Sequence, residues 1–165
     1  MSNDKIVFLD CDETLWTSPN KDRIWSVPGS FEVIDNNAIV RSDSAVFTLK
    51  KDVRQALGVL RDRWFCLWII SDNIAQQVAE VLNLFHLSDF FDQRFISVEL
   101  RESEKQRCPK EQMIKKLLEK HEWNSFKEVY LVDDKDYRQA MLDNGYKFIH
   151  SQYPSLLSDI EELVK

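Results

Sequence analysis

The sequence contains little glycine, little proline and no long apolar run, and each shortage excludes a class of protein. Only 3 glycines and 4 prolines occur in 165 residues, so no flexible linker or low-complexity tract is visible. No apolar run approaches the roughly 18 residues that a membrane-spanning helix needs. Residues 1–5 are polar and lead directly into an apolar run, which does not fit a signal peptide. We therefore expect a single domain over residues 1–165, located in the cytoplasm, with no membrane partner.

Positive charge and cysteine are also scarce. The 22 Lys and Arg residues are outnumbered by 28 Asp and Glu residues, which gives a formal net charge of −6. Nucleic acid is therefore not expected as the main partner, because its phosphates repel an acidic chain. Cys11, Cys66 and Cys108 are odd in number and lack the spacing of a zinc site, which favours a reducing compartment. The sequence predicts no particular oligomeric state.

Short apolar runs alternate with stretches of helical periodicity. The runs at 6–9, 65–70, 95–98, 129–132 and 147–150 are too short for helices and are typical of buried strands. Apolar residues at helical spacing fall between these runs, in 53–60, 74–82, 113–118 and 140–141, and a closing helix is expected at 156–163. This alternation predicts an α/β Rossmann-like fold, a mostly parallel sheet flanked by helices.

One stretch, at about residues 17–49, breaks the alternation. Two segments at 31–34 and 38–40 flank an Asp35-Asn36-Asn37 turn, which predicts a β-hairpin. Because it follows the first strand, we expect it to form a small flap at the carboxyl edge of the sheet, where ligands bind in open α/β folds.

Aromatic residues in and beside the flap have two interpretations. They could line a substrate site, or they could pack the flap onto the sheet, and base rates of burial favour packing. The residues concerned are Trp16, Trp25, Phe31 and Phe47.

Acidic and hydroxyl side chains follow three of the predicted strands. Asp10 to Thr14 follow the first strand, Ser71-Asp72-Asn73 the second, and Asp133-Asp134 the run at 129–132. In a parallel sheet these strand ends lie at one edge, so the carboxylates would repel one another unless a cation lay among them. Oxygen ligands of this kind suit Mg²⁺ rather than zinc.

Each motif has an ordinary interpretation when taken alone. Acids after a strand often form turns or helix N-caps, Ser71 could cap the next helix, and Lys110 could be a solvated residue. Their placement at one sheet edge is what favours a functional site.

Four segments of the chain resemble, in order, the four motifs of the haloacid dehalogenase superfamily. The matching residues are Asp10, Asp12 and Thr14 for the first motif, Ser71 for the second, Lys110 for the third, and Asp133 with Asp134 for the fourth. The Thr14-Leu15-Trp16 segment and residues 84–91 further resemble the magnesium-dependent phosphatase family. The likeness extends over residues 6–150.

The resemblance implies a phosphatase mechanism. Asp10 would attack phosphorus and form an aspartyl-phosphate, and Asp12 would act as the general acid and base. The implied phosphate-binding residues are Cys11, Thr14, Ser71, Asp72 and Lys110. The implied Mg²⁺ ligands are Asp10, the main-chain carbonyl of Asp12, and Asp134. Asp133 would contact these ligands rather than the ion itself.

The chain departs from the family pattern in two places. Asp72 stands where the family often has Arg, which puts a substrate contact in doubt. The segment 101–107 is long and charged, so Lys105 competes with Lys110 for the third motif, although only Lys110 suits the helix face. The three histidines, His86, His121 and His150, are expected to be peripheral.

The substrate and the exact reaction stay open at this point. A phosphotyrosine protein and a phosphosugar both fit an open site. A receiver-like module phosphorylated on Asp10, a phosphotransferase and a non-catalytic interaction protein are the alternatives. The second acid, Asp12, disfavours the receiver.

Overall fold

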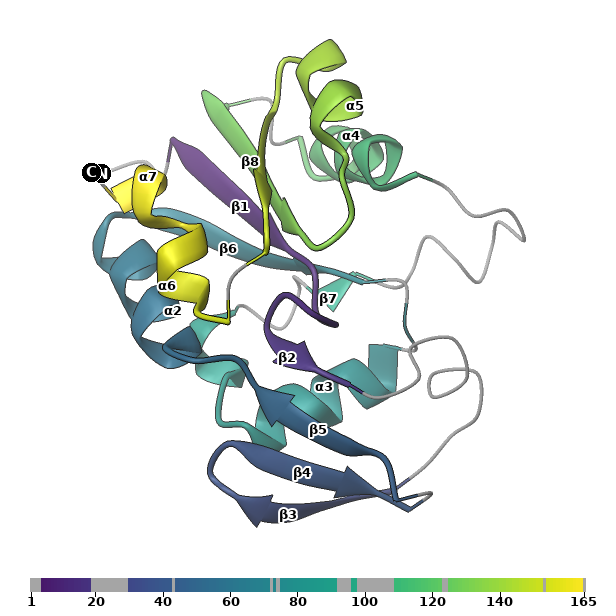
Figure 1. Cartoon of the computed structure of the whole chain (residues 1–165). Helices are drawn as coiled ribbons and strands as arrows, with labels where there is room; N and C mark the ends of the chain where they lie inside the picture. The colour runs from purple at the N-terminus through teal and green to yellow at the C-terminus, as the bar shows by residue number, and fades with distance from the viewer. Residues whose placement is uncertain are drawn as a thin grey trace.

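A computed structural model describes residues 4–18, 30–42, 44–71, 73, 75–91, 96–97, 109–122, 125–152 and 154–164. Its centre is a sheet of parallel strands in the order β7-β6-β1-β8-β9 (Figure 1). The strands are β1 (Lys5–Leu9), β6 (Phe65–Ile70), β7 (Ile96–Ser97), β8 (Glu128–Asp133) and β9 (Lys147–His150). The predicted α/β fold with a parallel sheet is confirmed.

The burial of β1, the middle strand, explains why its sequence is a continuous apolar run. Ile6, Val7, Phe8 and Leu9 of β1 are fully buried, because helices cover both faces of the sheet. Val7 and Leu9 belong to one core, and Ile6 and Phe8 belong to the other.

Helices form two outer layers (Figure 1). The core that contains Val7 also includes residues of α2 (Val53–Asp62), α3 (Ala75–Leu84) and α6 (Leu156–Asp159), with residues of α7 (Glu161–Val164) packed against it. The opposite core includes residues of α4 (Lys110–Lys120) and α5 (Arg138–Asp143). The helices that follow β1 and β6 therefore lie on one face, those that follow β7 and β8 lie on the other, and the strand order reverses where β1 meets β8. Such a switch point is where open α/β sheets bind ligands.

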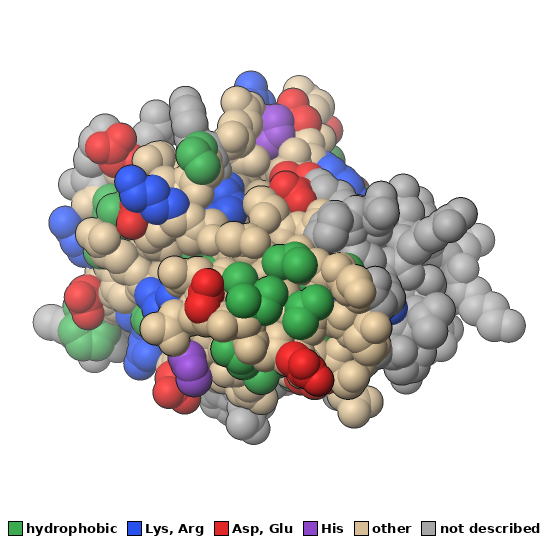
Figure 2. Space-filling model, turned by 60° about the horizontal axis from the view of Figure 1, so that its bottom comes forward, with side chains coloured by type: hydrophobic (Ala, Val, Ile, Leu, Met, Phe, Trp, Pro, Cys, Tyr) green, Lys and Arg blue, Asp and Glu red, His purple; other side chains and the backbone are tan. Residues whose placement is uncertain are grey.

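The flap is larger than the predicted hairpin. The hairpin itself is confirmed as β3 (Phe31–Asp35) and β4 (Ala38–Arg41), but β5 (Val46–Leu49) and the short β2 (Trp16–Thr17) extend it into an antiparallel sheet in the order β2-β5-β4-β3. Figure 2 shows apolar side chains grouped on the molecule's lower face, and the exposed large apolar residues of the flap are Val33, Ile34 and Val46.

The packing interpretation of the flap aromatics is confirmed for the residues that the structure describes. Trp16 and Phe47 are fully buried, and Phe31 is buried with its ring 5.5 Å from that of Phe47. Trp25 lies outside the described residues. The three buried aromatic residues belong to the same core as Val7 and Leu9 of β1, so the flap is packed directly against the body.

The closing helix differs from the sequence expectation. The closing helix is interrupted at Ile160, where φ is −96° and ψ is 6°, and α6 and α7 are separate short helices. Leu156 and Ile160 are both fully buried, so the interruption falls where the chain is anchored in the core. A 3₁₀ turn at Ser88–Phe90 follows α3.

In the described part of the chain, no helix is both long enough and apolar enough to cross a membrane.

Candidate active site

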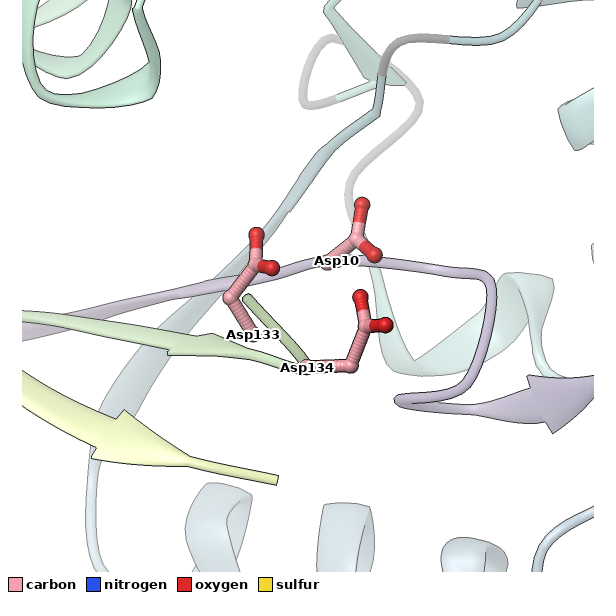
Figure 3. Close-up of side chains that lie close together, drawn as sticks. All are labelled: Asp10, Asp133 and Asp134. Carbon is pink, nitrogen blue, oxygen red and sulfur yellow. The ribbon is translucent and has the colours of Figure 1, made fainter. Parts of the chain in front are cut away.

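Three carboxylates meet at the switch point. Asp10 directly follows β1, and its amide donates to the Val132 carbonyl of β8 at 3.0 Å. Asp133 ends β8 and Asp134 follows it. Each of these three acids has a carboxylate oxygen within 4.8 Å of the others, and Figure 3 shows their side chains rising from the two neighbouring strand ends. The predicted grouping of acids at one edge is therefore present.

Lys110 connects two of these acids. It is the first residue of α4, just after Pro109, and its side chain is 3% exposed. Its Nζ donates to Asp10 Oδ1 at 2.6 Å and also to Asp133 Oδ2. Burial alone would lower the pKa of Lys110, but the two carboxylates outweigh burial and raise the pKa above its usual value. Lys110 is thus a fixed positive charge at the site, while the rival Lys105 lies outside the described residues.

The cluster has a deficit of positive charge. Burial raises the pKa of Asp10 to about 7, although Lys110 opposes the rise and the charge of Asp133 adds to it. When all are ionised, three carboxylates and one ammonium leave a formal charge of −2 on the four groups. A divalent cation would balance that charge, and an all-oxygen donor set fits Mg²⁺.

The loop after β1 makes a tight turn. The Cys11 carbonyl accepts from the amides of Thr14 and Leu15 at 3.2 and 2.8 Å, and Glu13 has a positive φ of 59°. The half-buried Asp12 carboxylate accepts from Trp16 Nε1 at 2.8 Å and from Asn73 Nδ2 at 2.6 Å. Asp12 therefore has a fixed position next to the cluster.

The other predicted phosphate-binding residues lie around this turn. Ser71, directly after β6, is buried, and its Oγ accepts from the main-chain N–H of Asn73 at 3.2 Å. Thr14 is fully buried, and its hydroxyl has no hydrogen-bond partner among the described residues. Burial raises the pKa of the Cys11 thiol, and the nearby acids Asp10 and Asp12 raise it further, so this thiol stays protonated. Asp72 lies outside the described residues.

A family model of haloacid dehalogenase-like hydrolases matches residues 21–149 of the chain. The chain belongs to this hydrolase family. The matched part includes Ser71, Lys110 and the Asp133-Asp134 pair, and the Asp10 loop precedes it.

A solved structure resembles this hydrolase in fold. The crystal structure of an uncharacterized protein from Listeria monocytogenes serotype 4b superimposes with a TM-score of 0.57 at 19% identity, over 88% of this chain and 78% of that one. At such identity the likeness concerns the fold alone. No curated protein matches the chain.

The hydrolase places His150 at the site, although the sequence analysis predicted it to be peripheral. That prediction is wrong, because His150 ends β9 and its Nε2 donates to the main-chain carbonyl of Asp134 at 2.8 Å. The position was deducible, since β9 is a parallel strand and its last residue must reach the same sheet edge as Asp10.

A buried ion pair beneath the Asp10 loop was also missed. Lys50 Nζ lies 3.0 Å from Asp159 Oδ2 and donates to Ser151 Oγ at 2.7 Å. Both Lys50 Nζ and Ser151 Oγ lie 3.5 Å from the Glu13 carbonyl. Because the partners are 101 and 109 residues from Lys50, no local sequence pattern could indicate the cluster.

A cavity of about 700 Å³ opens beside Asp134, between the flap and the end of β9. Its lining is rich in hydroxyl, amide and carboxylate groups. The polar lining residues include Glu13, Thr17, Thr48, Asp134, His150 and Gln152.

Proposed function

We propose that this hydrolase is a Mg²⁺-dependent phosphomonoester phosphatase of the magnesium-dependent phosphatase type, with Asp10 as its nucleophile. The observation that carries the proposal is the cluster of the buried Asp10 and Asp133 with the half-buried Asp134, in which Lys110 donates to Asp10 and to Asp133. Its position at the switch point, beside an open cavity whose lining includes Glu13, Lys50 and Ser151, supports a role in binding a charged ligand.

The metal would be held by Asp10, Asp134 and the main-chain carbonyl of Asp12. Asp133 is fully buried and accepts from both Lys110 and the Lys135 amide, which suits a supporting role behind the ligands. When bound, Mg²⁺ supplies positive charge that offsets the repulsion between the Asp10 carboxylate and the phosphate oxygens.

The chemistry proceeds in two balanced steps. An oxygen of Asp10 forms a bond to phosphorus while the ester P–O bond breaks, and the leaving oxygen takes a proton from Asp12. Water then attacks the phosphorus of the aspartyl-phosphate and gives its proton to Asp12. The bond between phosphorus and Asp10 breaks, which releases inorganic phosphate and restores the Asp10 carboxylate.

Lys110 and the loop residues would hold the phosphate in place. Lys110 provides a permanent positive charge, and Ser71 provides a hydroxyl at the adjacent strand end. Cys11, Thr14 and Asp72 complete the proposed phosphate-binding set.

The cavity favours a small phosphate ester over a phosphotyrosine protein. Its polar lining offers hydrogen bonds to a hydroxyl-bearing leaving group such as that of a phosphosugar. The flap aromatics Trp16, Phe31 and Phe47, which could have held an aromatic ring, are buried in packing instead. We place the enzyme in the cytoplasm, because three cysteines, an odd number without the spacing of a metal site, favour a reducing compartment.

The test is hydrolysis of p-nitrophenyl phosphate with Mg²⁺ or with EDTA. We expect turnover that needs Mg²⁺ and that falls by at least about 10³-fold in Asp10→Asn. Asp62→Asn is the matched control, because it removes the same charge at the exposed end of α2 and should leave the rate unchanged.

Two results would contradict the proposal. A folded wild type that turns over no phosphate ester would point to a receiver-like module if phosphate stayed on the protein. Turnover that rises when an alcohol acceptor is added would point to a phosphotransferase.

A further inference from the structure

The carboxylate of Asp12 is held from two directions. Trp16 Nε1 donates to Oδ1 at 2.8 Å, and Asn73 Nδ2 donates to Oδ2 at 2.6 Å. A weaker third contact comes from Ser18 Oγ, which donates to Oδ1 at 3.3 Å. Both carboxylate oxygens therefore have donors, and rotation of the side chain about its last bond would break those hydrogen bonds.

Both principal donors are themselves immobilised. The indole of Trp16 is fully buried, with its ring 6.0 Å from that of Phe85. The main-chain N–H of Asn73 donates to Ser71 Oγ at the end of β6, which fixes the backbone that carries the Asn73 side chain. The donors thus belong to two separate elements, β2 at the base of the flap and the loop after β6.

We propose that Trp16 and Asn73 are positioning residues that jointly orient the Asp12 carboxylate for proton transfer to the leaving group. The inference rests on the proposed phosphatase function, and it adds two residues to which the phosphatase motifs assign no role. Neither residue needs to contact the substrate, because each acts through Asp12.

The proposal predicts a dependence on the leaving group. An alkoxide is a poor leaving group and needs its proton from Asp12, whereas p-nitrophenolate is stable as an anion and needs little help. Misorienting Asp12 should therefore slow alkyl ester cleavage more than aryl ester cleavage. The quantity to compare is kcat/KM, because it reports the steps up to departure of the leaving group.

The experiment measures kcat/KM for glycerol 2-phosphate and p-nitrophenyl phosphate in wild type, Trp16→Phe and Asn73→Leu. Trp16→Phe keeps a buried ring and removes only the indole N–H, and Asn73→Leu keeps side-chain length and removes the donor. We expect each variant to lose at least about tenfold more on the alkyl ester than on the aryl ester.

Trp68→Phe is the matched control. Trp68 is equally buried and stacks on Phe8 in the core of the opposite sheet face, with ring centroids 5.6 Å apart. It should lower stability much as Trp16→Phe does and leave the ratio of the two kcat/KM values unchanged. Thermal unfolding of all variants shows whether they are folded at the assay temperature, and Asn73→Leu at a half-buried position keeps the test valid if Trp16→Phe does not fold.

A double-mutant cycle identifies the route of the effect. In an Asp12→Asn background, adding Trp16→Phe should change neither ester's rate further, because the group that Trp16 orients has lost its proton-transfer role. An additive loss would contradict action through Asp12.

Different results would overturn the positioning role and the phosphatase function. Equal losses on both esters in Trp16→Phe and Asn73→Leu would overturn the positioning role and leave the phosphatase function intact. A wild type that cleaves neither ester would overturn the function and the inference with it.

Discussion

At the scale of single residues, the site is dominated by the charge of Asp10. Its carboxylate is buried beside two other acids, and Lys110 alone among the described basic side chains is ion-paired with it. Burial raises its pKa to about 7, so a proton competes with any cation for this carboxylate near neutral pH.

Mg²⁺ affinity should therefore depend on pH through Asp10. Below pH 7 the affinity is expected to fall about tenfold per pH unit, because Asp10 must lose one proton before it binds the ion. Above that pH the affinity should level off. Isothermal titration with MgCl₂ between pH 5 and pH 8 measures the slope.

The raised pKa of Asp10 also decides how the stability of the metal-free protein changes with pH. Between its ordinary pKa of 3.8 and about 7, folded Asp10 keeps a proton that the unfolded chain has lost, so the metal-free protein loses stability as pH rises through this window. In Asp10→Asn both the affinity slope and this stability loss should disappear. A Mg²⁺ affinity that is flat from pH 5 to pH 7 in the wild type would contradict the account.

At the scale of secondary-structure elements, the Lys50 cluster connects the flap to the body. Lys50 follows β5, Ser151 follows β9 and Asp159 belongs to α6, and the side chains of Lys50 and Asp159 are 5% and 0% exposed. Their contacts reach the Glu13 carbonyl, so the same cluster supports the Asp10 loop. A buried pair of this kind is costly to break, because one charge is left without its partner.

Lys50→Met should destabilise the protein by about 3–5 kcal/mol, and Lys50→Met with Asp159→Leu should recover most of that loss. Urea unfolding monitored by tryptophan fluorescence measures both. Lys127→Met is the matched control, since Lys127 pairs with Asp4 at 2.6 Å on the surface and solvent screens the pair. A single variant no less stable than the control, or a double variant no better than the single, would contradict the connecting role.

At the scale of the whole molecule, the sequence predicts the fold and the place of the site because strand ends carry the signal. The strands β1, β6 and β8 contain continuous apolar runs, and Asp10, Ser71 and Asp133 come where those runs end. Parallel strands bring those ends to one edge, so the carboxylate cluster followed from the order of elements. Lys110 is predicted by its resemblance to the third family motif, and the helix face favours it over Lys105.

What the sequence could not predict depends on long-range or very short features. Asn73 contacts Asp12 across 61 residues, and Lys50 contacts Asp159 across 109. The strand β2 has only two residues, too few for a periodic pattern, so the sequence predicts only the hairpin of the flap. His150 ends the strand predicted at 147–150, so its place at this sheet edge could be deduced from the order of elements.

The most direct test of the central claim is to trap the aspartyl-phosphate. The enzyme is mixed with p-nitrophenyl phosphate and Mg²⁺, quenched during turnover and treated with borohydride, which reduces an acyl phosphate to an alcohol. Mass spectrometry of the peptide that contains residues 6–21 then identifies the modified residue. The account predicts conversion of Asp10 to homoserine, only in the presence of substrate. Full turnover with an unmodified Asp10, or with the modification on another acid such as Asp12, would contradict it.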